Sequence, residues 1–293
     1  MPDGLAWIPP QTVTVGSDEH YPEEAPAHEV TVDGFWIQPH PVTNAAFGAF
    51  VEATGYVTVA QRPLNPADYP GAPAANLQPG SMVFRRTPGP VDLRHLSQWW
   101  TWTPGACWNH PRGPRSSLRG REQHPVVHVA FEDAAAYANW AGLSLPTEAQ
   151  WEVAARGGLA HAAYTWGPDP ERPGEQLANY WHGEFPYLPD SGYGQSTPVG
   201  SFPANDYGLF DMAGNVWEWT TDFYAATRDS RSCCAADSYD PDQPGTPVAR
   251  RVIKGGSFLC ADSYCRRYRP AARRPQSVDT GMSHIGFRCV CPG

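Results

Sequence analysis

The chain has 293 residues, of which 41% are hydrophobic, and its formal net charge is −9. This length can bury one large core, and we expect a single domain over residues 1–293, because no linker or low-complexity tract divides the sequence. The acidic charge disfavours nucleic acid as a partner, and no run of about 18 apolar residues predicts a membrane span.

The amino-acid composition indicates an irregular, aromatic-rich fold. The 28 glycines and 32 prolines are typical of turns, and the 12 Trp, 13 Tyr and 11 Phe would fill the space between loops. We therefore expect an α+β fold with low regular secondary structure. The first residues, MPDGLAWIPP, lack the basic and apolar regions of a secretory signal, which favours a cytoplasmic protein. Seven cysteines are an odd number for a disulfide framework, so they are better interpreted as metal ligands, catalytic groups or small buried hydrophobes.

Strand-like stretches come first along the chain, at residues 5–15 and 28–37. Thr43 then offers the cap of a helix that Gly55 can end. Residues 62–122 hold many turn signals and few periodic runs. Four tryptophans in this stretch either cover the core or line a substrate groove: Trp99, Trp100, Trp102 and Trp108.

A more regular unit follows this stretch. Residues 124–129 are expected to form a strand, and residues 132–141 a helix with acidic residues at its positive end. Thr147 and Gln150 have the spacing of a capping box, which predicts a second helix that Gly157 ends. The rest of the chain returns to short strands and loops.

The sharpest local feature is the pair Cys260 and Cys265, which follows Gly255-Gly256. Three interpretations of the pair are open: two thiolate ligands for a soft metal such as Cu(I), a redox disulfide, or two inert core residues. Nearby arginines lower the pKa of a thiol and favour metal binding. Such a basic patch in an acidic protein suggests a site, and its members fall within nine positions: Arg266, Arg267, Arg269, Arg273 and Arg274.

The surrounding motifs resemble those of formylglycine-generating enzymes, the sulfatase-modifying factors. The resemblance covers nearly the whole chain, and its strongest part runs from Gly255 to Arg269. Further matching motifs are AWIP at 6–9, YPEEAP at 21–26, PVTN at 41–44, ATGY at 53–56, HPVVHV at 124–129, LPTE at 145–148, ANYW at 178–181, GNVWEW at 214–219 and GFRC at 286–289. Many of them belong to a broader superfamily with a fold related to C-type lectins. The two cysteines are what distinguish its oxidase branch.

The resemblance implies an oxidase that converts a cysteine of a client sulfatase into formylglycine. Cys260 and Cys265 would hold Cu(I), and Ser257 would assist oxygen or substrate binding beside them. The substrate would be the Cys-x-Pro-x-Arg segment of an unfolded or nascent sulfatase, with O2 as oxidant. Trp217 and Tyr264 match residues that line the peptide groove. His284 replaces an Asn near that groove.

The resemblance also implies two calcium sites, whose ligands would be hard oxygen atoms. The first would use Asp211, Gly214, Val216 and Glu218. The second would use Asn179, Tyr180, Asp190 and Tyr193. Asp190 takes part there because a short deletion puts Ser191 in the place of the usual acidic ligand.

The remaining cysteines and histidines have no expected role in the chemistry. Cys289 lacks the partner that secreted relatives have, so we expect a buried free thiol. His124 and His128 are interpreted as structural. No role is assigned to Cys107, Cys233, Cys234 or Cys291.

Three rival functions stand beside the oxidase, which the family resemblance suggests is a monomer. The first is a non-heme iron sulfoxide synthase of the same superfamily, which would need a three-histidine site. The second is a non-catalytic lectin-like binding module, which would lack a cysteine of the pair or the serine beside it. The third is a serine or cysteine hydrolase, for which no nucleophile lies in a recognisable triad setting.

Overall fold

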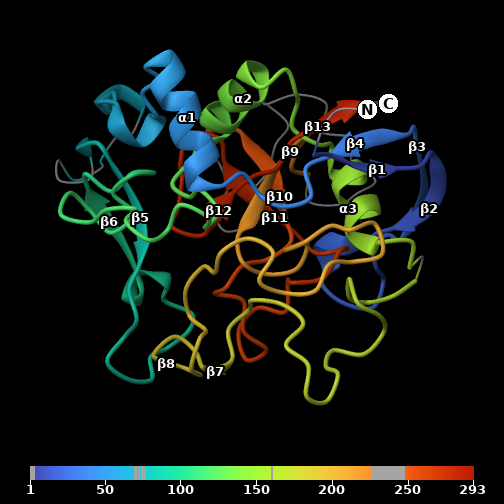
Figure 1. Ribbon diagram of the computed structural model, residues 1–293. Helices are drawn as coiled ribbons and strands as arrows, with labels where there is room; N and C mark the ends of the chain where they lie inside the picture. The colour runs from blue at the N-terminus through green and yellow to red at the C-terminus, as the bar shows by residue number, and fades with distance from the viewer. Residues whose placement is uncertain (1–3, 69–70, 72, 74–76, 160, 226–247) are drawn as a thin grey trace.

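The computed structural model describes residues 4–68, 71, 73, 77–159, 161–225 and 248–293. Its strands are short and its loops long, in agreement with the expected α+β class (Figure 1). The α-helices of the described residues are α1 (Asn44–Thr54), α2 (Phe131–Trp140) and α3 (Glu148–Arg156). Short 3-10 turns occur at Pro22–Glu24, Val59–Gln61, Pro66–Asp68 and Leu96–Gln98.

Local side-chain chemistry sets the helix ends. Thr43 Oγ1 accepts from Ala46 N at the start of α1, and Gly55 ends that helix with a φ of 66°. Thr147 and Gln150 form the predicted capping box of α3, since each side chain accepts from the other residue's backbone N–H. The caps predicted for both helices are thus confirmed.

A four-stranded sheet has the order β11-β10-β9-β12, and its strand β10 leads directly to the segment that holds Cys260 and Cys265. These strands are β9 (Trp217–Phe223), β10 (Arg250–Lys254), β11 (Arg273–Ser277) and β12 (Ile285–Gly286). β9 pairs antiparallel with β10 and parallel with β12. A three-stranded sheet has the order β1-β4-β13 and consists of β1 (Ala6–Ile8), β4 (Phe35–Ile37) and β13 (Val290–Pro292).

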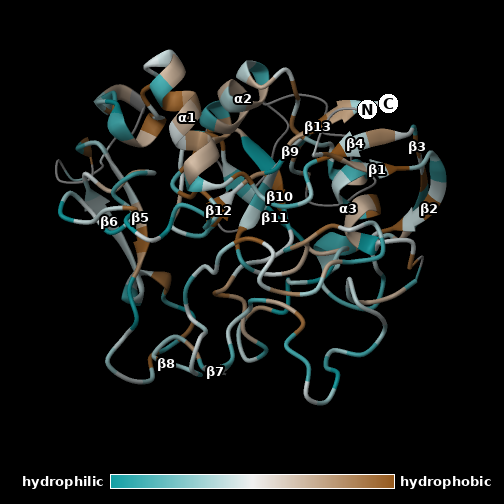
Figure 2. Ribbon diagram, viewed as in Figure 1, coloured by the Kyte–Doolittle hydropathy of each residue, from teal (hydrophilic) through white to brown (hydrophobic). Residues whose placement is uncertain are grey.

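The other strands form two-stranded ribbons. They are β2 (Gln11–Val15) with β3 (His28–Val32), β5 (Gly80–Phe84) with β6 (Trp100–Pro104), and β7 (Gly183–Glu184) with β8 (Leu188–Pro189). Figure 1 shows the β5–β6 ribbon at the left of the central sheet and α1 beside α2 above it. α3 has both hydrophilic and hydrophobic turns (Figure 2), and it nevertheless buries Glu152 and Arg156.

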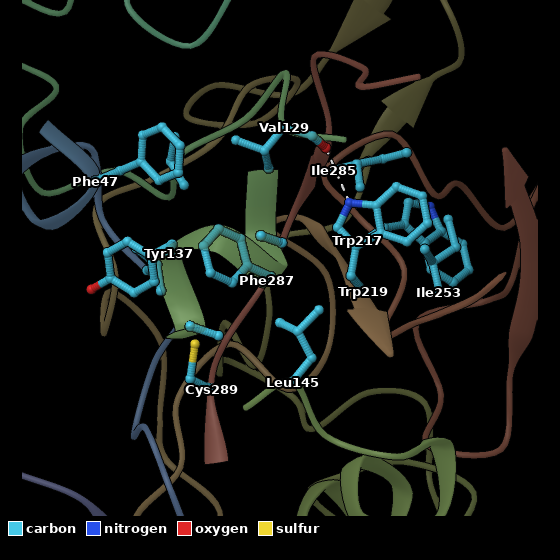
Figure 3. Packing of buried hydrophobic residues seen from close by; sticks show 14 of the residues in the cluster. Phe47, Val129, Tyr137, Leu145, Trp217, Trp219, Ile253, Ile285, Phe287 and Cys289 are labelled. Carbon is cyan, nitrogen blue, oxygen red and sulfur yellow. Dashed lines mark hydrogen bonds between the residues drawn. The ribbon is translucent and has the colours of Figure 1, made fainter. Parts of the chain in front are cut away.

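The largest core lies between α1, α2 and the four-stranded sheet (Figure 3). Trp219 is completely buried there, and its Nε1 donates to Val129 O at 3.0 Å, which satisfies the indole. Cys289 is also completely buried in this core and is a free thiol, as predicted. Burial raises its pKa, so it stays protonated.

Residues 124–129 do not form the predicted strand. Pro125 makes an isolated bridge with Thr43, and the backbone of His128 is left-handed with a φ of 61°. Val126 and Val129 are completely buried. The apolar pattern therefore comes from a segment that passes through the core, where a short run of buried residues needs no strand ladder.

Two other predicted stretches are more divided than expected. Residues 5–15 split into β1 and β2 at Pro9-Pro10, because proline has no N–H for a ladder. Residues 28–37 split into β3 and β4 around Gly34, whose added Cβ would lie 2.4 Å from the Trp7 ring. In the described part of the chain, no helix has the length and hydropathy needed to cross a membrane.

Candidate active site

The cysteine pair lies on a compact turn that follows β10. Gly255 and Gly256 both have positive φ, and a Cβ on Gly256 would lie 2.7 Å from Arg267 O. Only glycine allows this close approach, which closes the loop between residues 256 and 267. Within the loop, Cys260 N donates to Ser257 O at 2.9 Å and Cys265 N to Ala261 O at 2.6 Å. These turns point the two cysteines toward one another.

The two sulfur atoms lie 3.2 Å apart and are not joined by a disulfide. Cys260 is 2% exposed and Cys265 is 5% exposed. Burial raises the pKa of Cys260. The hydrogen bond from Cys260 lowers the pKa of Cys265, with the charges of Arg267 and Arg274 acting in the same direction. The positive charges near Cys265 therefore favour a thiolate at that sulfur.

This donor set fits Cu(I), because two facing sulfur atoms are the soft ligands that this ion prefers. The described residues include no group of three or more His, Cys, Asp or Glu side chains suited to a metal ion. A copper ion held between Cys260 and Cys265 would therefore have these two cysteines as ligands, with no third His, Cys, Asp or Glu ligand from the described residues.

Ser257 and Tyr264 lie on the same turn as the cysteines. Ser257 is completely buried, and its Oγ accepts from Leu259 N at 3.2 Å. The half-buried Tyr264 ring stacks on Phe185 at 4.8 Å and meets Trp99 edge-on at 5.7 Å. These three aromatic rings form one wall beside the sulfur pair.

Trp217 and His284 come from other elements but are joined to each other. Trp217 N donates to His284 O at 2.9 Å, which anchors β9 beside the segment before β12. Trp217 packs in the same cluster as the two cysteines and is only 3% exposed, so it is almost completely covered. The His284 ring lies 4.7 Å from the Trp100 ring. Burial, with Arg274, lowers the pKa of His284 to about 3, so its imidazole is neutral at pH 7.

Three arginines of the basic patch are paired with carboxylates from other parts of the chain. Arg267 pairs with Glu23, the buried Arg269 with Glu24, and the buried Arg273 with Glu148. Arginines this deep need carboxylate partners, and the partners come from distant parts of the chain. Arg266 alone of these four is mainly exposed, with a side chain 60% accessible.

The residues expected at the first calcium site lie together, and two of them already have partners. Asp211 accepts from Gly200 N and Asn215 Nδ2. Both oxygens of the buried Glu218 accept from Arg288, each at 2.7 Å, and Trp151 Nε1 donates to Oε2. A calcium ion bound there would have to share Glu218 with Arg288.

The second expected calcium set contains an unsatisfied oxygen. Asn179 is 1% exposed, and its Oδ1 is buried without a hydrogen-bond partner. The ring of His182 lies between Tyr180 and Tyr193, with centroids 4.1 Å and 4.0 Å away. This stack brings the Asn179 segment and the Asp190 turn together. An orphaned amide oxygen of this kind fits a hard cation.

Sequence reasoning missed Tyr21 and Glu23 as neighbours of the cysteine pair. Glu23 binds Arg267, and Arg267 Nη1 lies 3.9 Å from Cys265 Sγ. Tyr21 and Glu23 both belong to the YPEEAP motif. The sequence reveals this motif, but it does not reveal that the motif contacts the cysteine pair.

The cysteines without an expected role are also free thiols in the described residues. Cys107 is buried and Cys291 partly buried. Cys233 and Cys234 lie outside the described residues.

Comparison with known proteins identifies the family. A family model described as the sulfatase-modifying factor enzyme 1-like domain matches residues 1–292. The chain belongs to this family. It is 57% identical to the formylglycine-generating enzyme of Mycobacterium tuberculosis, over 98% of this chain and 97% of that protein. The formylglycine-generating enzyme of Thermomonospora curvata is 44% identical, over 98% of this chain and 93% of that protein.

The sulfatase-modifying factor family also has members without activity. The inactive C-alpha-formylglycine-generating enzyme 2 of Mus musculus is 37% identical, over 91% of this chain and 78% of that protein. Among solved structures, PvdO from Pseudomonas aeruginosa has a TM-score of 0.62 at 22% identity, over 98% of this chain and 93% of that chain. CarF has a TM-score of 0.57 at 21% identity, over 100% of this chain and 99% of that chain. These likenesses confirm the predicted fold.

Proposed function

We propose that this chain is a copper-dependent formylglycine-generating oxidase that acts on a cysteine of a sulfatase. The observation behind the proposal is the pair of buried, unbridged sulfur atoms 3.2 Å apart. Relatives that match this chain over nearly its full length are named formylglycine-generating enzymes. The substrate would be an unfolded or nascent sulfatase bearing Cys-x-Pro-x-Arg.

The proposed net reaction consumes one O2 for each cysteine. The thiol-bearing methylene of the client cysteine becomes an aldehyde, the sulfur leaves as hydrogen sulfide, and the second oxygen atom becomes water. A thiol reductant supplies the two electrons and two protons that complete this balance. Cu(I) held by Cys260 and Cys265 would supply the one-electron oxygen chemistry that amino-acid side chains lack.

The chain's own residues would prepare the site in three ways. The deep burial of Cys260 and Cys265 keeps bulk water and other thiols from the sulfur pair. The partly exposed Tyr264 ring, packed on the buried Phe185 and Trp99, offers apolar surface to an extended peptide. His284 stays neutral beside Trp100, so it adds no charge that would repel the substrate arginine.

Calcium would have a structural role in this proposal. Asn179 Oδ1 provides one buried oxygen without a partner, and Asn179 also bridges to Gly214 of the other expected set. A cation at this point would join the Asn179 segment to the turn before β9. It would thereby hold Trp217, the first residue of β9, beside the cysteine pair.

A cytoplasmic monomer is the setting we propose. All five cysteines in the described residues are free, and free thiols are typical of a reducing compartment. The presence of an inactive relative at 37% identity keeps a non-catalytic binding module as the second candidate.

The deciding experiment incubates the purified protein with Cu(I), air, a thiol reductant and a peptide containing Cys-Thr-Pro-Ser-Arg. Conversion lowers the peptide mass by about 18 Da and creates an aldehyde that a hydrazide traps, as the copper-supplied oxidation requires. Conversion that stops when Cys260 or Cys265 is replaced by Ser supports the oxidase. A protein that binds the peptide without copper and without conversion would instead be the binding module.

A further inference from the structure

Arg267 connects the N-terminal part of the chain to the copper-ligand candidate Cys265. Its Nε and Nη2 donate to Glu23 Oε1 at 2.9 Å and 2.7 Å. Its guanidinium carbon lies 3.8 Å from the centre of the Tyr21 ring. Its Nη1 faces Cys265 Sγ at 3.9 Å. Three sides of one guanidinium are thus used by an anion, an aromatic face and a sulfur atom.

The neighbouring arginines are bound differently. Arg269 is held by Glu24, and its Nε donates to Arg266 O. Arg266 is exposed, with its side-chain Nε 3.8 Å from Asp262 Oδ1. Of these three arginines, only Arg267 has a side-chain contact with a cysteine sulfur.

We propose that Arg267, oriented by Glu23 and Tyr21, is the positioning residue that balances the charge of Cys265 when the sulfur pair holds Cu(I). The inference rests on the proposed copper function. Two thiolates with one Cu(I) have a net negative charge, and Cys260 and Cys265 hold it away from water. A guanidinium at 3.9 Å compensates this charge, because charges interact more strongly at a site with little solvent.

The planar fork of arginine matters to this role. Two nitrogens can stay on Glu23 while the third faces sulfur, and the flat face can stack on Tyr21. The point charge of a lysine cannot make all of these contacts at once. The ion pair with Glu23 is partly buried, with side chains 17% and 18% exposed, so solvent screens it only in part.

The test measures Cu(I) affinity under anaerobic conditions by competition with a chromophoric Cu(I) chelator, without any turnover. Arg267→Gln should weaken Cu(I) binding by about 10- to 100-fold, the usual effect of losing a residue that supports a metal ligand. Arg267→Lys should recover part of the loss, because it restores the charge. Glu23→Gln should weaken binding less than Arg267→Gln, since the guanidinium remains but loses its anchor.

The matched control is Arg266→Gln, which removes the same charge one residue away from an exposed side chain. It should leave Cu(I) affinity unchanged. Wild-type affinity in a folded Arg267→Gln protein would overturn the inference, and so would an equal loss in Arg266→Gln. If the wild-type protein itself binds no Cu(I), the proposed copper function is wrong. If the wild-type protein binds Cu(I) and only the Arg267 effect is missing, the role of Arg267 is wrong and the copper function stands.

Discussion

Arg269 and Glu24 form an ion pair that is almost completely buried, with Arg269 Nη1 2.8 Å from Glu24 Oε2. The side chains are 1% and 0% exposed, and the residues are 245 positions apart. The pair ties the segment 265–269 to the 3-10 turn Pro22–Glu24. It thus helps to position Arg267 and Cys265, which lie on that segment.

Glu24→Gln should destabilise the protein by about 3–5 kcal/mol, because it leaves the buried Arg269 without its charge partner. Urea denaturation measures the change in the free energy of unfolding. The control is Glu132→Gln, which breaks the exposed pair with Arg62 and should cost about 1 kcal/mol or less. Equal effects in the two variants would contradict the role of burial.

Cys260→Ser and Cys265→Ser should each abolish both Cu(I) binding and peptide conversion, since a single remaining sulfur makes a poor site for this soft ion. Copper content after desalting and the peptide mass provide the two measurements. Cys291→Ser is the control, because this partly buried free thiol lies on β13 and should be dispensable. Retained copper in either of the first two variants would show that the metal binds elsewhere.

His128 should make stability depend on pH. Burial lowers its pKa to about 4 from the usual 6.5, while its ring bonds Ser81 Oγ and Pro111 O. The unfolded chain therefore takes up a proton before the folded chain does as pH falls. The neutral ring contributes stability above about pH 6.5, and by about pH 4 roughly 3 kcal/mol of it is lost.

The His128→Asn variant isolates this effect, because Asn tolerates the left-handed backbone at φ 61°. Unfolding free energies of both proteins are compared at several pH values. The wild type should lose more stability than the variant as the pH falls from 7 to 4. Parallel pH profiles would show that His128 does not titrate as its burial requires.

Calcium should stabilise the protein through Asn179. A ligand that binds only the folded state adds about 2.7 kcal/mol at 100 times its Kd, so the Tm should rise when Ca2+ is added to the chelator-treated protein. Asn179→Ala should remove most of this rise, because it deletes the buried Oδ1. Mg2+ serves as the control cation. A Ca2+ response that survives the Asn179→Ala change would place the ion away from this side chain.

The parts of the fold that short-range chemistry determines could be predicted from sequence. The caps of α1 and α3 depend on residues three positions apart, such as Thr147 and Gln150, and both were found. The strand expected at residues 124–129 was wrong, because a short run of buried residues such as Val126 and Val129 looks the same in a strand and in an irregular core segment. A run of apolar residues indicates that a segment is buried, but it does not indicate which groups the backbone of that segment hydrogen-bonds to.

The sequence by itself determined the family and the cysteine pair, because both depend on residues that lie close together along the chain. Only the tertiary structure decided the charge partners. It placed Glu23 on Arg267, Glu24 on Arg269 and Arg288 on Glu218. A buried charge requires a partner of opposite charge, and any carboxylate or guanidinium that the fold brings near can serve as that partner. The choice among thirty acidic residues therefore depends on long-range packing, which no local spacing reveals.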